Sequence, residues 1–339
     1  MASPRGFCAG VQMAIKALAW MVRVFEPPVY CYHEIVHNQV VVERFRDLGV
    51  VFVDDVSEVP EGRPVMLSAH GSAPEVVEAA REKGGAVVDA VCPLVTKVHH
   101  EVKLRASKGY TVIYVGHRGH EEAVGTMAVA PEAIHLVETV AEVEALPEPE
   151  GPVAFLAQTT LAVSEWRSIL EAAQRRWPDL WVPGRSDLCF ATTNRQTALR
   201  AIAGRCDAIV VIGSDNSSNT LALVRTALSA GCPRAVRVNR ASELPPDLTG
   251  TVGVIAGASA PESLVEEVVA ALAPAFGTEE VAAIDEDEYF PLPRELRELL
   301  RTTAAVLGAA TFAPVGGLAA PALDGRDVEA AQVLATLDV

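Results

Sequence analysis

The sequence lacks any long uninterrupted apolar run, and this absence argues against a protein that spans a membrane. Half of the 339 residues are hydrophobic, yet no stretch of about 18 uncharged apolar residues occurs, so no transmembrane helix is predicted. Lys16 and Arg23 interrupt the apolar stretch after Arg5 at helical spacing. This pattern indicates an amphipathic helix rather than a signal peptide, and we expect a cytoplasmic protein.

An excess of positive charge is also missing. The formal net charge of −16 argues against nucleic acid and anionic membranes as partners. The sequence contains neither G-x-x-x-x-G-K-[ST] nor G-x-G-x-x-G, so neither a P-loop nor a Rossmann dinucleotide site is predicted.

Closely spaced cysteine pairs are absent as well, but three isolated cysteines share one context. Cys8, Cys92 and Cys189 each follow a turn-like stretch and precede an amphipathic helical pattern. A thiol at a helix start experiences the positive end of the helix dipole, which is expected to lower its pKa and favour the metal-binding thiolate. Successive members are separated by about one small domain, so each of three domains would donate one thiolate to a shared centre.

The alternative is that these cysteines are small buried hydrophobic residues, because no C-x-x-C pair accompanies them. Cys31, Cys206 and Cys232 lack the helix-start context, and for them the buried-core interpretation is preferred. Six cysteines in a chain of this length do not indicate a secreted disulfide framework.

Short β-branched runs alternate with helical patterns, which predicts an α/β fold with parallel sheets. The clearest runs are at 28–32, 64–68, 111–115, 153–157, 208–212 and 251–255. Polar loops follow most of them, and ligands of such sheets bind beyond the carboxyl ends of the strands. Backbone N–H groups and hydroxyls before helix starts favour an anion, although ordinary helix N-caps would explain the same residues.

Two local patterns leave alternatives open. His33 to His37 spell H-E-x-x-H, but His33 directly follows a strand-like run, so a helical zinc-protease site is not expected. Either Glu121 or Glu122, beside His120, could act as a general acid near an anion. Solvated acidic residues at a helix start are the alternative.

Taken together, the motifs resemble those of the 4-hydroxy-3-methylbut-2-enyl diphosphate reductase family over roughly residues 4–300. The matching stretches are 4–10 (PRGFCAG), 33–38 (HEIVHN), 68–71 (SAHG), 89–99 (DAVCPLVTKVH), 116–122 (GHRGHEE), 158–161 (QTTL), 189–196 (CFATTNRQ), 216–220 (NSSNT), 257–262 (GASAPE) and 292–297 (LPRELR).

The resemblance implies three similar small α/β domains in a pseudo-threefold, trefoil arrangement around one 4Fe–4S cluster. The predicted boundaries are 1–92, 93–188 and 189–277, followed by a segment 278–302 that packs back on the body and a mobile Ala/Gly/Pro-rich tail, 303–339. Family chains usually carry a short strand before the first cysteine motif, and only Met1 to Ser3 precede it here. Either this chain begins late relative to the family, or the first sheet lacks an edge strand.

The resemblance also implies roles for particular residues. Cys8, Cys92 and Cys189 match the cluster ligands, which leaves one iron open for substrate. Glu122 matches the proton donor, and Thr159 matches the threonine at the hydroxyl end of the substrate. Contacts to the diphosphate are implied for His37, His70, His120, Ser217, Ser218, Asn219 and Ser259.

The implied reaction is the reductive dehydroxylation of (E)-4-hydroxy-3-methylbut-2-enyl diphosphate to isopentenyl and dimethylallyl diphosphate. This is the last step of the methylerythritol phosphate route, with ferredoxin or flavodoxin as electron donor. Two alternatives remain. One is another three-cysteine cluster enzyme of the quinolinate-synthase type, and the other is a cluster-binding paralogue or redox sensor with little turnover.

Overall fold

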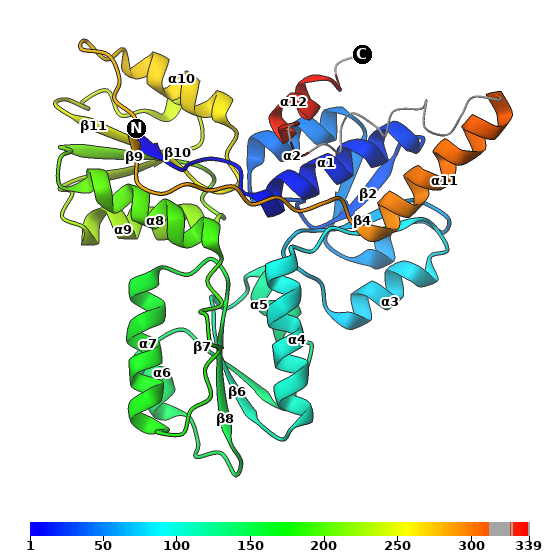
Figure 1. The fold of residues 1–339 in the computed structure, drawn as a ribbon, viewed down its shortest axis with the longest axis horizontal. Helices are drawn as coiled ribbons and strands as arrows, with labels where there is room; N and C mark the ends of the chain where they lie inside the picture. The colour runs from blue at the N-terminus through cyan, green and yellow to red at the C-terminus, as the bar shows by residue number, and fades with distance from the viewer. Residues whose placement is uncertain (312–325, 327, 338–339) are drawn as a thin grey trace.

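The computed structural model describes residues 1–311, 326 and 328–337. In this part of the chain, short parallel strands form several small sheets with helices packed against them. The ribbon divides into three lobes, each built around one sheet (Figure 1). The α/β prediction with parallel sheets is confirmed.

The first lobe contains a sheet in the order β3-β2-β4-β5, and every pairing in it is parallel. Val29 and Cys31 face a core shared with helices α1 and α2, whereas Tyr30 and Tyr32 face α3 on the other side. The elements are α1 (Ala9–Val24), β2 (Val29–Tyr32), α2 (Gln39–Asp47), β3 (Val50–Val53), the 3-10 turn η1 (Val56–Glu58), β4 (Val65–Leu67), α3 (Pro74–Glu82) and β5 (Val87–Asp89).

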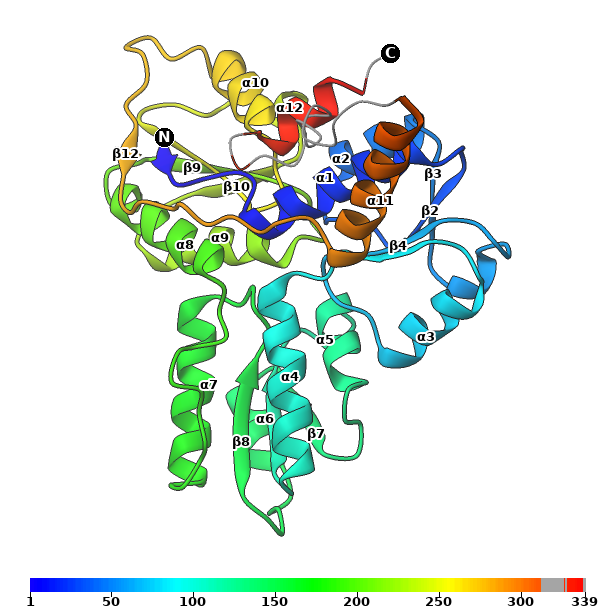
Figure 2. The ribbon, with the colours of Figure 1, turned by 45° about the vertical axis from the view of Figure 1, so that its right-hand side comes forward.

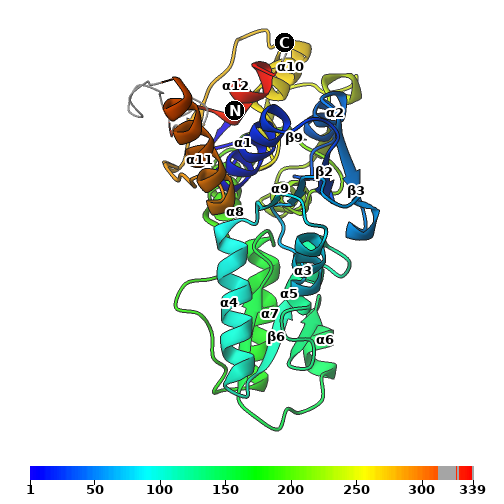
Figure 3. The same cartoon turned by 90° about the vertical axis from the view of Figure 1, so that its right-hand side faces the viewer.

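The second lobe lies below the other two in the view of Figure 3. Its sheet has the order β7-β6-β8. One face packs against α6 and α7 and the other against α4 and α5. The elements are α4 (Pro93–Ser107), β6 (Thr111–Val115), α5 (Glu121–Met127), β7 (Ile134–Val137), α6 (Val140–Ala145), β8 (Val153–Ala157) and α7 (Val163–Arg176).

The third lobe contains a sheet in the order β10-β9-β11. Helices α8 and α9 cover one face, and α10 covers the other. The elements are α8 (Phe190–Ala203), β9 (Ala208–Ile212), α9 (Ser218–Ser229), β10 (Ala235–Val238), the 3-10 turn η2 (Ala241–Glu243), β11 (Val252–Ala256) and α10 (Glu262–Leu272). The predicted domain boundaries stay a prediction, although the sheet of each lobe falls within one of the predicted units.

The first residues of the chain form strand β1 (Ala2–Ser3), which pairs in parallel with β12 (Val281–Ala282) beside the third lobe (Figure 2). The sheet of the first lobe contains no N-terminal strand. Arg5 extends the attachment, because its guanidinium forms ion pairs with Glu262 and Glu280. The stretch before Cys8 is therefore held by the third lobe.

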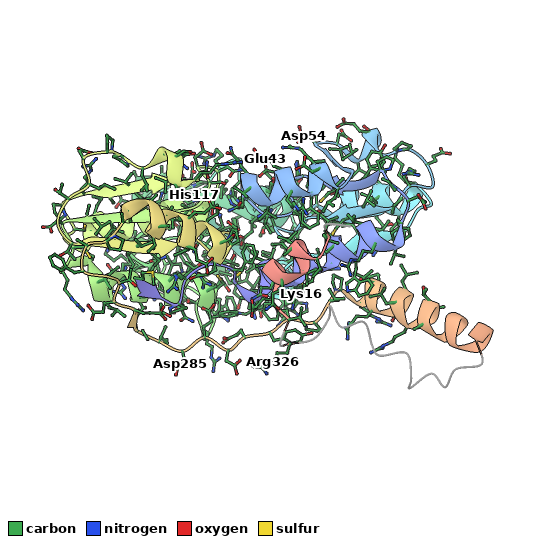
Figure 4. The ribbon with its side chains drawn as sticks, turned by 90° about the horizontal axis from the view of Figure 1, so that it is seen from above. Lys16, Glu43, Asp54, His117, Asp285 and Arg326 are labelled. Carbon is green, nitrogen blue, oxygen red and sulfur yellow. The ribbon has the colours of Figure 1, made fainter. Side chains whose placement is uncertain are left out.

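After β12 the chain crosses from the third lobe to the first, where Leu292 and Leu296 enter the core (Figure 4). Helix α11 (Arg294–Thr311) follows. Helix α12 (Ala330–Ala335) packs on α1 through buried Ala330 and Val333. The tail predicted from 303 thus contains helical residues at 303–311 and 330–335, and its predicted mobility stays a prediction. For 312–325, 327, 338 and 339 it lies outside the described residues.

The sheets of the three lobes direct the carboxyl ends of their strands toward one central cavity. The loops after β4, β6, β8, β9 and β11 meet there, together with the starts of α1, α4 and α8. Among the described helices, none combines the length and apolar character needed to cross a bilayer.

Replacing Leu296 by Ala tests whether the C-terminal segment is part of the first core. Leu296 is fully buried against the first lobe, so we expect Leu296→Ala to lower the free energy of unfolding by about 2–5 kcal/mol. Leu228→Ala is the matched control, because Leu228 is 51% exposed and should cost at most about 0.5 kcal/mol. Urea unfolding measures both; equal losses would contradict the packing.

Candidate functional site

One cavity of about 100 Å³ lies where the strand ends and helix starts of the three lobes meet. All the predicted site residues line it: Cys8, His37, His70, Cys92, His120, Glu122, Thr159, Cys189, Ser217, Ser218, Asn219 and Ser259. A larger cavity of about 790 Å³ lies beside β12 and the loop after α10. Among the described residues that line this larger cavity, none is a predicted site residue.

The three cysteines occupy equivalent positions. Cys8 is the N-cap residue of α1, Cys92 that of α4 and Cys189 that of α8. This confirms the helix-start context that the sequence predicted. Pro93 occupies the first turn of α4, where its missing N–H costs nothing.

The backbone of each cysteine is tied to a different lobe in a cyclic pattern. The N–H of Cys8 donates to Ala258 O of the third lobe at 3.0 Å. That of Cys92 donates to Ala69 O of the first lobe at 3.0 Å, and that of Cys189 to Thr159 O of the second lobe at 2.9 Å. Each helix that begins one lobe is thus attached to the strand-end loop of another.

Two of the three thiols, those of Cys8 and Cys92, lie close together at Gly10, and all three line the cavity. A Cβ atom at Gly10 would lie 2.9 Å from Cys92 Sγ and 3.9 Å from Cys8 Sγ. Cys189 Sγ accepts a hydrogen bond from the N–H of Thr192 at 3.2 Å. All three cysteines are free rather than disulfide-bonded. Three convergent free thiols are a ligand set that suits a soft metal or an iron–sulfur centre.

Burial controls the protonation of these thiols and corrects the sequence prediction. Burial raises the pKa of all three, and a charged Cys8 nearby raises the pKa of Cys92 and Cys189 further. The pKa of Cys189 reaches about 12. Desolvation therefore outweighs the helix-start effect from which a lowered pKa was predicted. A bound cation would reverse the balance, because a coordinating thiol is deprotonated.

Three histidines form a compact group beside the thiols. The rings of His37 and His70 stack with centroids 3.9 Å apart, and His120 stands edge-on to them at 5.2 and 5.9 Å. Burial, followed by the neighbouring imidazoles, lowers the pKa of His120 to about 2 and also lowers the pKa of His37. Neither ring nitrogen of His37 has a hydrogen-bond partner among the described residues. These rings can therefore donate to an anion that enters the cavity.

The two adjacent glutamates at the start of α5 have different environments. Glu122 is 2% exposed. Thr159 donates to it twice, from N at 2.7 Å and from Oγ1 at 2.9 Å. Burial nevertheless raises the pKa of Glu122 to about 7. A carboxyl group that exchanges its proton near neutral pH is suited to general acid chemistry.

Glu121 points to the histidines instead. Its Oε2 lies 2.8 Å from His70 Nδ1, and its Oε1 lies 3.9 Å from His33 Nδ1. Burial acts to raise its pKa, but His70, His37 and His33 outweigh burial and lower the pKa to about 2. The structure thus favours Glu122 over Glu121 as the acid. The side chains of His37, His70 and Glu121 also bring ligand atoms within 4.8 Å of one another, close enough for a metal ion.

Most of the predicted hydroxyl and amide groups already have protein partners. Ser217 caps α9, because its Oγ accepts from the N–H of Thr220 at 3.3 Å. Ser259 Oγ donates to His37 O at 2.9 Å. Asn219 accepts from the N–H of Ala258 at 2.9 Å. The capping alternative therefore applies to Ser217, while all of these groups still line the cavity.

The H-E-x-x-H pentapeptide is not helical, as expected. His33 has a positive φ of 58°, and α2 begins only at Gln39. His33 and His37 therefore do not stand one turn apart on a helix face, which the zinc-protease geometry requires. His33 also lies outside the residues that line the cavity, whereas His37 is among them.

The structure adds residues near the site to which the sequence analysis gave no role. Thr192 contacts Cys189 and accepts a hydrogen bond from Asn219 Nδ2 at 3.3 Å. His99 is buried beside Gly71, and burial lowers its pKa to about 4. Both residues lie inside the family motifs at 189–196 and 89–99. That position was the only feature of the sequence that could have pointed to them.

The fold and cavity define a class of protein: an α/β protein of three lobes whose central cavity is lined by three free cysteines and three histidines. Comparison with known proteins narrows this class. The family model described as LytB protein matches residues 1–273. The chain belongs to the LytB family.

Named relatives are similar along nearly their whole length. The 4-hydroxy-3-methylbut-2-enyl diphosphate reductase of Cereibacter sphaeroides is 48% identical over 311 residues, 89% of this chain and 97% of the relative. The reductase of the same name from Rhodopirellula baltica is 46% identical over 311 residues, 90% of this chain and 97% of the relative. The solved structure of the E-1-hydroxy-2-methyl-but-2-enyl-4-diphosphate reductase from Plasmodium falciparum has a TM-score of 0.85 at 33% identity, covering 89% of this chain and 97% of that one.

Replacing Gly10 by Ala tests the close packing of the thiols. In an ordinary helix this change would stabilise the protein by about 1 kcal/mol. Here the new methyl group would lie 2.9 Å from Cys92 Sγ. We therefore expect Gly10→Ala to cost about 1–3 kcal/mol and to lower the iron bound after anaerobic reconstitution.

Gly204→Ala is the matched control, because a Cβ atom there meets nothing within 4 Å. It should keep both the unfolding midpoint and the iron content of the parent protein. Equal unfolding midpoints and iron contents in the two variants would show that a methyl group fits at Gly10 and would contradict the close packing against Cys92 Sγ.

Proposed function

We propose that this protein catalyses the reductive dehydroxylation of (E)-4-hydroxy-3-methylbut-2-enyl diphosphate to isopentenyl and dimethylallyl diphosphate, the last step of the methylerythritol phosphate route to isoprenoids. The supporting observation is that one cavity gathers three helix-capping cysteines, three histidines and a protonatable carboxyl group. The relatives named as reductases of this diphosphate support the same reaction.

Cys8, Cys92 and Cys189 would hold one 4Fe–4S cluster. Their free thiols line one cavity, and three sulfur ligands leave one iron without a protein ligand. When bound, such a cluster supplies the two electrons and a Lewis-acidic iron. The cyclic attachment of each cysteine to another lobe supports a pseudo-threefold, trefoil arrangement of domains around this centre.

His37, His70 and His120, with Ser217, Ser218, Asn219 and Ser259, would bind the diphosphate. All three histidines line the cavity, and the ring nitrogens of His37 have no hydrogen-bond partner among the described residues. An anion favours the protonated form of an imidazole. Recognition would therefore combine uptake of protons by the histidines with donation from helix starts and hydroxyls. A cluster of lysines, which would compete for an anionic iron–sulfur centre, is not needed.

Glu122 would deliver the proton to the departing oxygen. In the balanced reaction the allylic C–O bond breaks and the oxygen leaves as water. A C–H bond forms from a second proton, and two electrons reduce the carbon skeleton. Thr159 holds the carboxyl group in place through two hydrogen bonds. Because the cavity is much smaller than the roughly 300–1,000 Å³ typical of ligand pockets, lobes or side chains must move apart to admit the substrate.

The two electrons would come from ferredoxin or flavodoxin. The similarity to named reductases along most of the chain favours this reaction over a quinolinate-synthase-type activity. A cluster-binding paralogue with little turnover is distinguished only by assay.

The function is tested by anaerobic reconstitution with iron and sulfide, followed by an assay with dithionite and a viologen mediator. We expect about four iron atoms per chain, because three thiols hold one cubane cluster, and formation of both isopentenyl and dimethylallyl diphosphate. Cys92→Ser should lose the cluster. Cys206→Ser, altered at a free cysteine away from the cavity, should retain it. A parent protein that binds the cluster but forms no product would refute the proposal.

Replacing Glu122 by Gln removes the proposed proton donor. We expect the cluster to remain and kcat to fall by about 10²–10⁴-fold. The pKa of Glu122 is raised to about 7 by burial, and the protonated form is the active one. The rate of the parent enzyme should therefore fall as the pH rises through about 7.

Glu121→Gln is the matched control for this pH dependence. The pKa of Glu121 is lowered to about 2 by the histidines, which outweigh burial, so its carboxylate stays charged across neutral pH. That variant should keep the fall in rate near pH 7, whereas Glu122→Gln should lose it. An unchanged pH profile in Glu122→Gln would remove Glu122 from the acid role.

A further inference from the structure

Arg195 is a buried cation in α8, close behind the Cys189 ligand. Its side chain is 1% exposed, and a buried charge is stable only when its donors are satisfied. Nε and Nη2 both donate to Gly6 O, at 3.0 and 2.6 Å. Nη1 donates to Ala191 O at 3.1 Å. The guanidinium therefore connects the backbone two residues before Cys8 with the backbone two residues after Cys189.

The counter-charge comes from the segment that follows β12. Both carboxylate oxygens of Glu286 lie 3.0 Å from Arg195 Nη1. Asn194 Nδ2 also donates to Glu286, at 3.0 Å. Glu286 is itself 12% exposed, so the ion pair is largely shielded from water. Arg195 thereby joins three parts of the chain that are far apart in sequence.

The glycine that receives this bond is fixed in place. Gly6 has a positive φ of 71°, a conformation that favours glycine. Its N–H donates to Ala256 O at the end of β11. A Cβ atom there would lie 3.2 Å from Ala260 O. The loop that carries Cys8 is therefore held between β11 and Arg195.

The charged pair lies close to two of the three cysteines. Arg195 is on α8, whose N-cap residue is Cys189, and it donates to the backbone two residues before Cys8. Glu286 binds the same guanidinium and carries the opposite charge. In a site shielded from water, the two charges act in opposite directions on any negative charge added at the same centre.

We propose that Arg195 is a positioning residue for the thiol site, which holds the Cys8 loop on α8 and, balanced by Glu286, sets the reduction potential of the cluster bound there. The inference rests on the proposed function. The planar guanidinium is suited to this task because it spans Gly6, Ala191 and Glu286 at once and cannot lose its charge. Net charge around an iron–sulfur cluster is one of the main determinants of its potential.

The alternative is that Arg195 only ties segments together, as Arg5 does with Glu262 and Glu280. If the ion pair is purely structural, removing the charge of Arg195 or of Glu286 should change the site in the same direction. An electrostatic role predicts opposite effects, because Arg195→Gln removes a positive charge whereas Glu286→Gln removes a negative one.

The test is a mediated redox titration of the reconstituted full-length holoprotein, followed by electron paramagnetic resonance, with iron content measured alongside. We expect Arg195→Gln to shift the potential to more negative values and Glu286→Gln to more positive values. Arg195→Lys should have a potential close to that of the parent protein, because an ammonium keeps the positive charge. It should bind less iron than the parent, because the planar contacts of the guanidinium are lost. Arg5→Gln is the matched control and should leave the potential unchanged.

Shifts of the same sign in Arg195→Gln and Glu286→Gln, or shifts no larger than that of Arg5→Gln, would overturn the inference and leave the proposed function intact. If Arg195→Gln does not retain a cluster, the other two variants test the inference. A positive shift in Glu286→Gln with a near-parent potential in Arg195→Lys supports it, and any other result overturns it. A parent protein that assembles no cluster would overturn both proposals together.

Discussion

Three backbone hydrogen bonds hold this site together, each from the N–H of a helix-capping cysteine to a carbonyl of another lobe. Each cysteine lies where the chain passes from one lobe to the first helix of the next, so its position depends on both lobes. The same geometry places each Sγ atom at the start of a helix near the centre of the molecule. The first N–H groups of that helix then have no side-chain acceptor stronger than a thiol. Packing therefore brings the thiols into one cavity. Desolvation there raises the pKa of all three thiols, so their thiolate forms are disfavoured unless a cation is bound.

The surroundings of the thiols divide into regions with distinct tasks. The imidazoles of His37, His70 and His120 form one group, in which burial lowers the pKa of His37 and His120. Glu122 is buried beside this group and accepts two hydrogen bonds from Thr159. The neighbouring carboxylate of Glu121 instead contacts His70, and the histidines lower its pKa. The two consecutive glutamates thus differ in pKa, because burial raises the pKa of Glu122 despite two hydrogen bonds from Thr159, whereas imidazoles outweigh burial at Glu121 and lower its pKa.

Much of the fold was readable from local patterns, and the misses have a common cause. Strands β4, β8 and β9 are buried on both faces and appear in the sequence as continuous apolar runs. The edge strands β3 and β7 mix buried and exposed positions and were not singled out. The helices α11 and α12 were missed because Ala and Gly lowered the contrast of their apolar faces, although Ala330 and Val333 pack on α1.

By itself, the sequence determined the α/β class, the helix-start cysteines and the motifs that identify the family, because these depend on residue type and short-range spacing. Only the tertiary structure decided that burial raises the pKa of those thiols, that Glu122 rather than Glu121 has a neutral-range pKa, and that Arg195 joins Gly6 to Glu286. These properties arise from desolvation and from contacts between segments far apart in the chain. Neither can be computed from the neighbours of a residue in sequence.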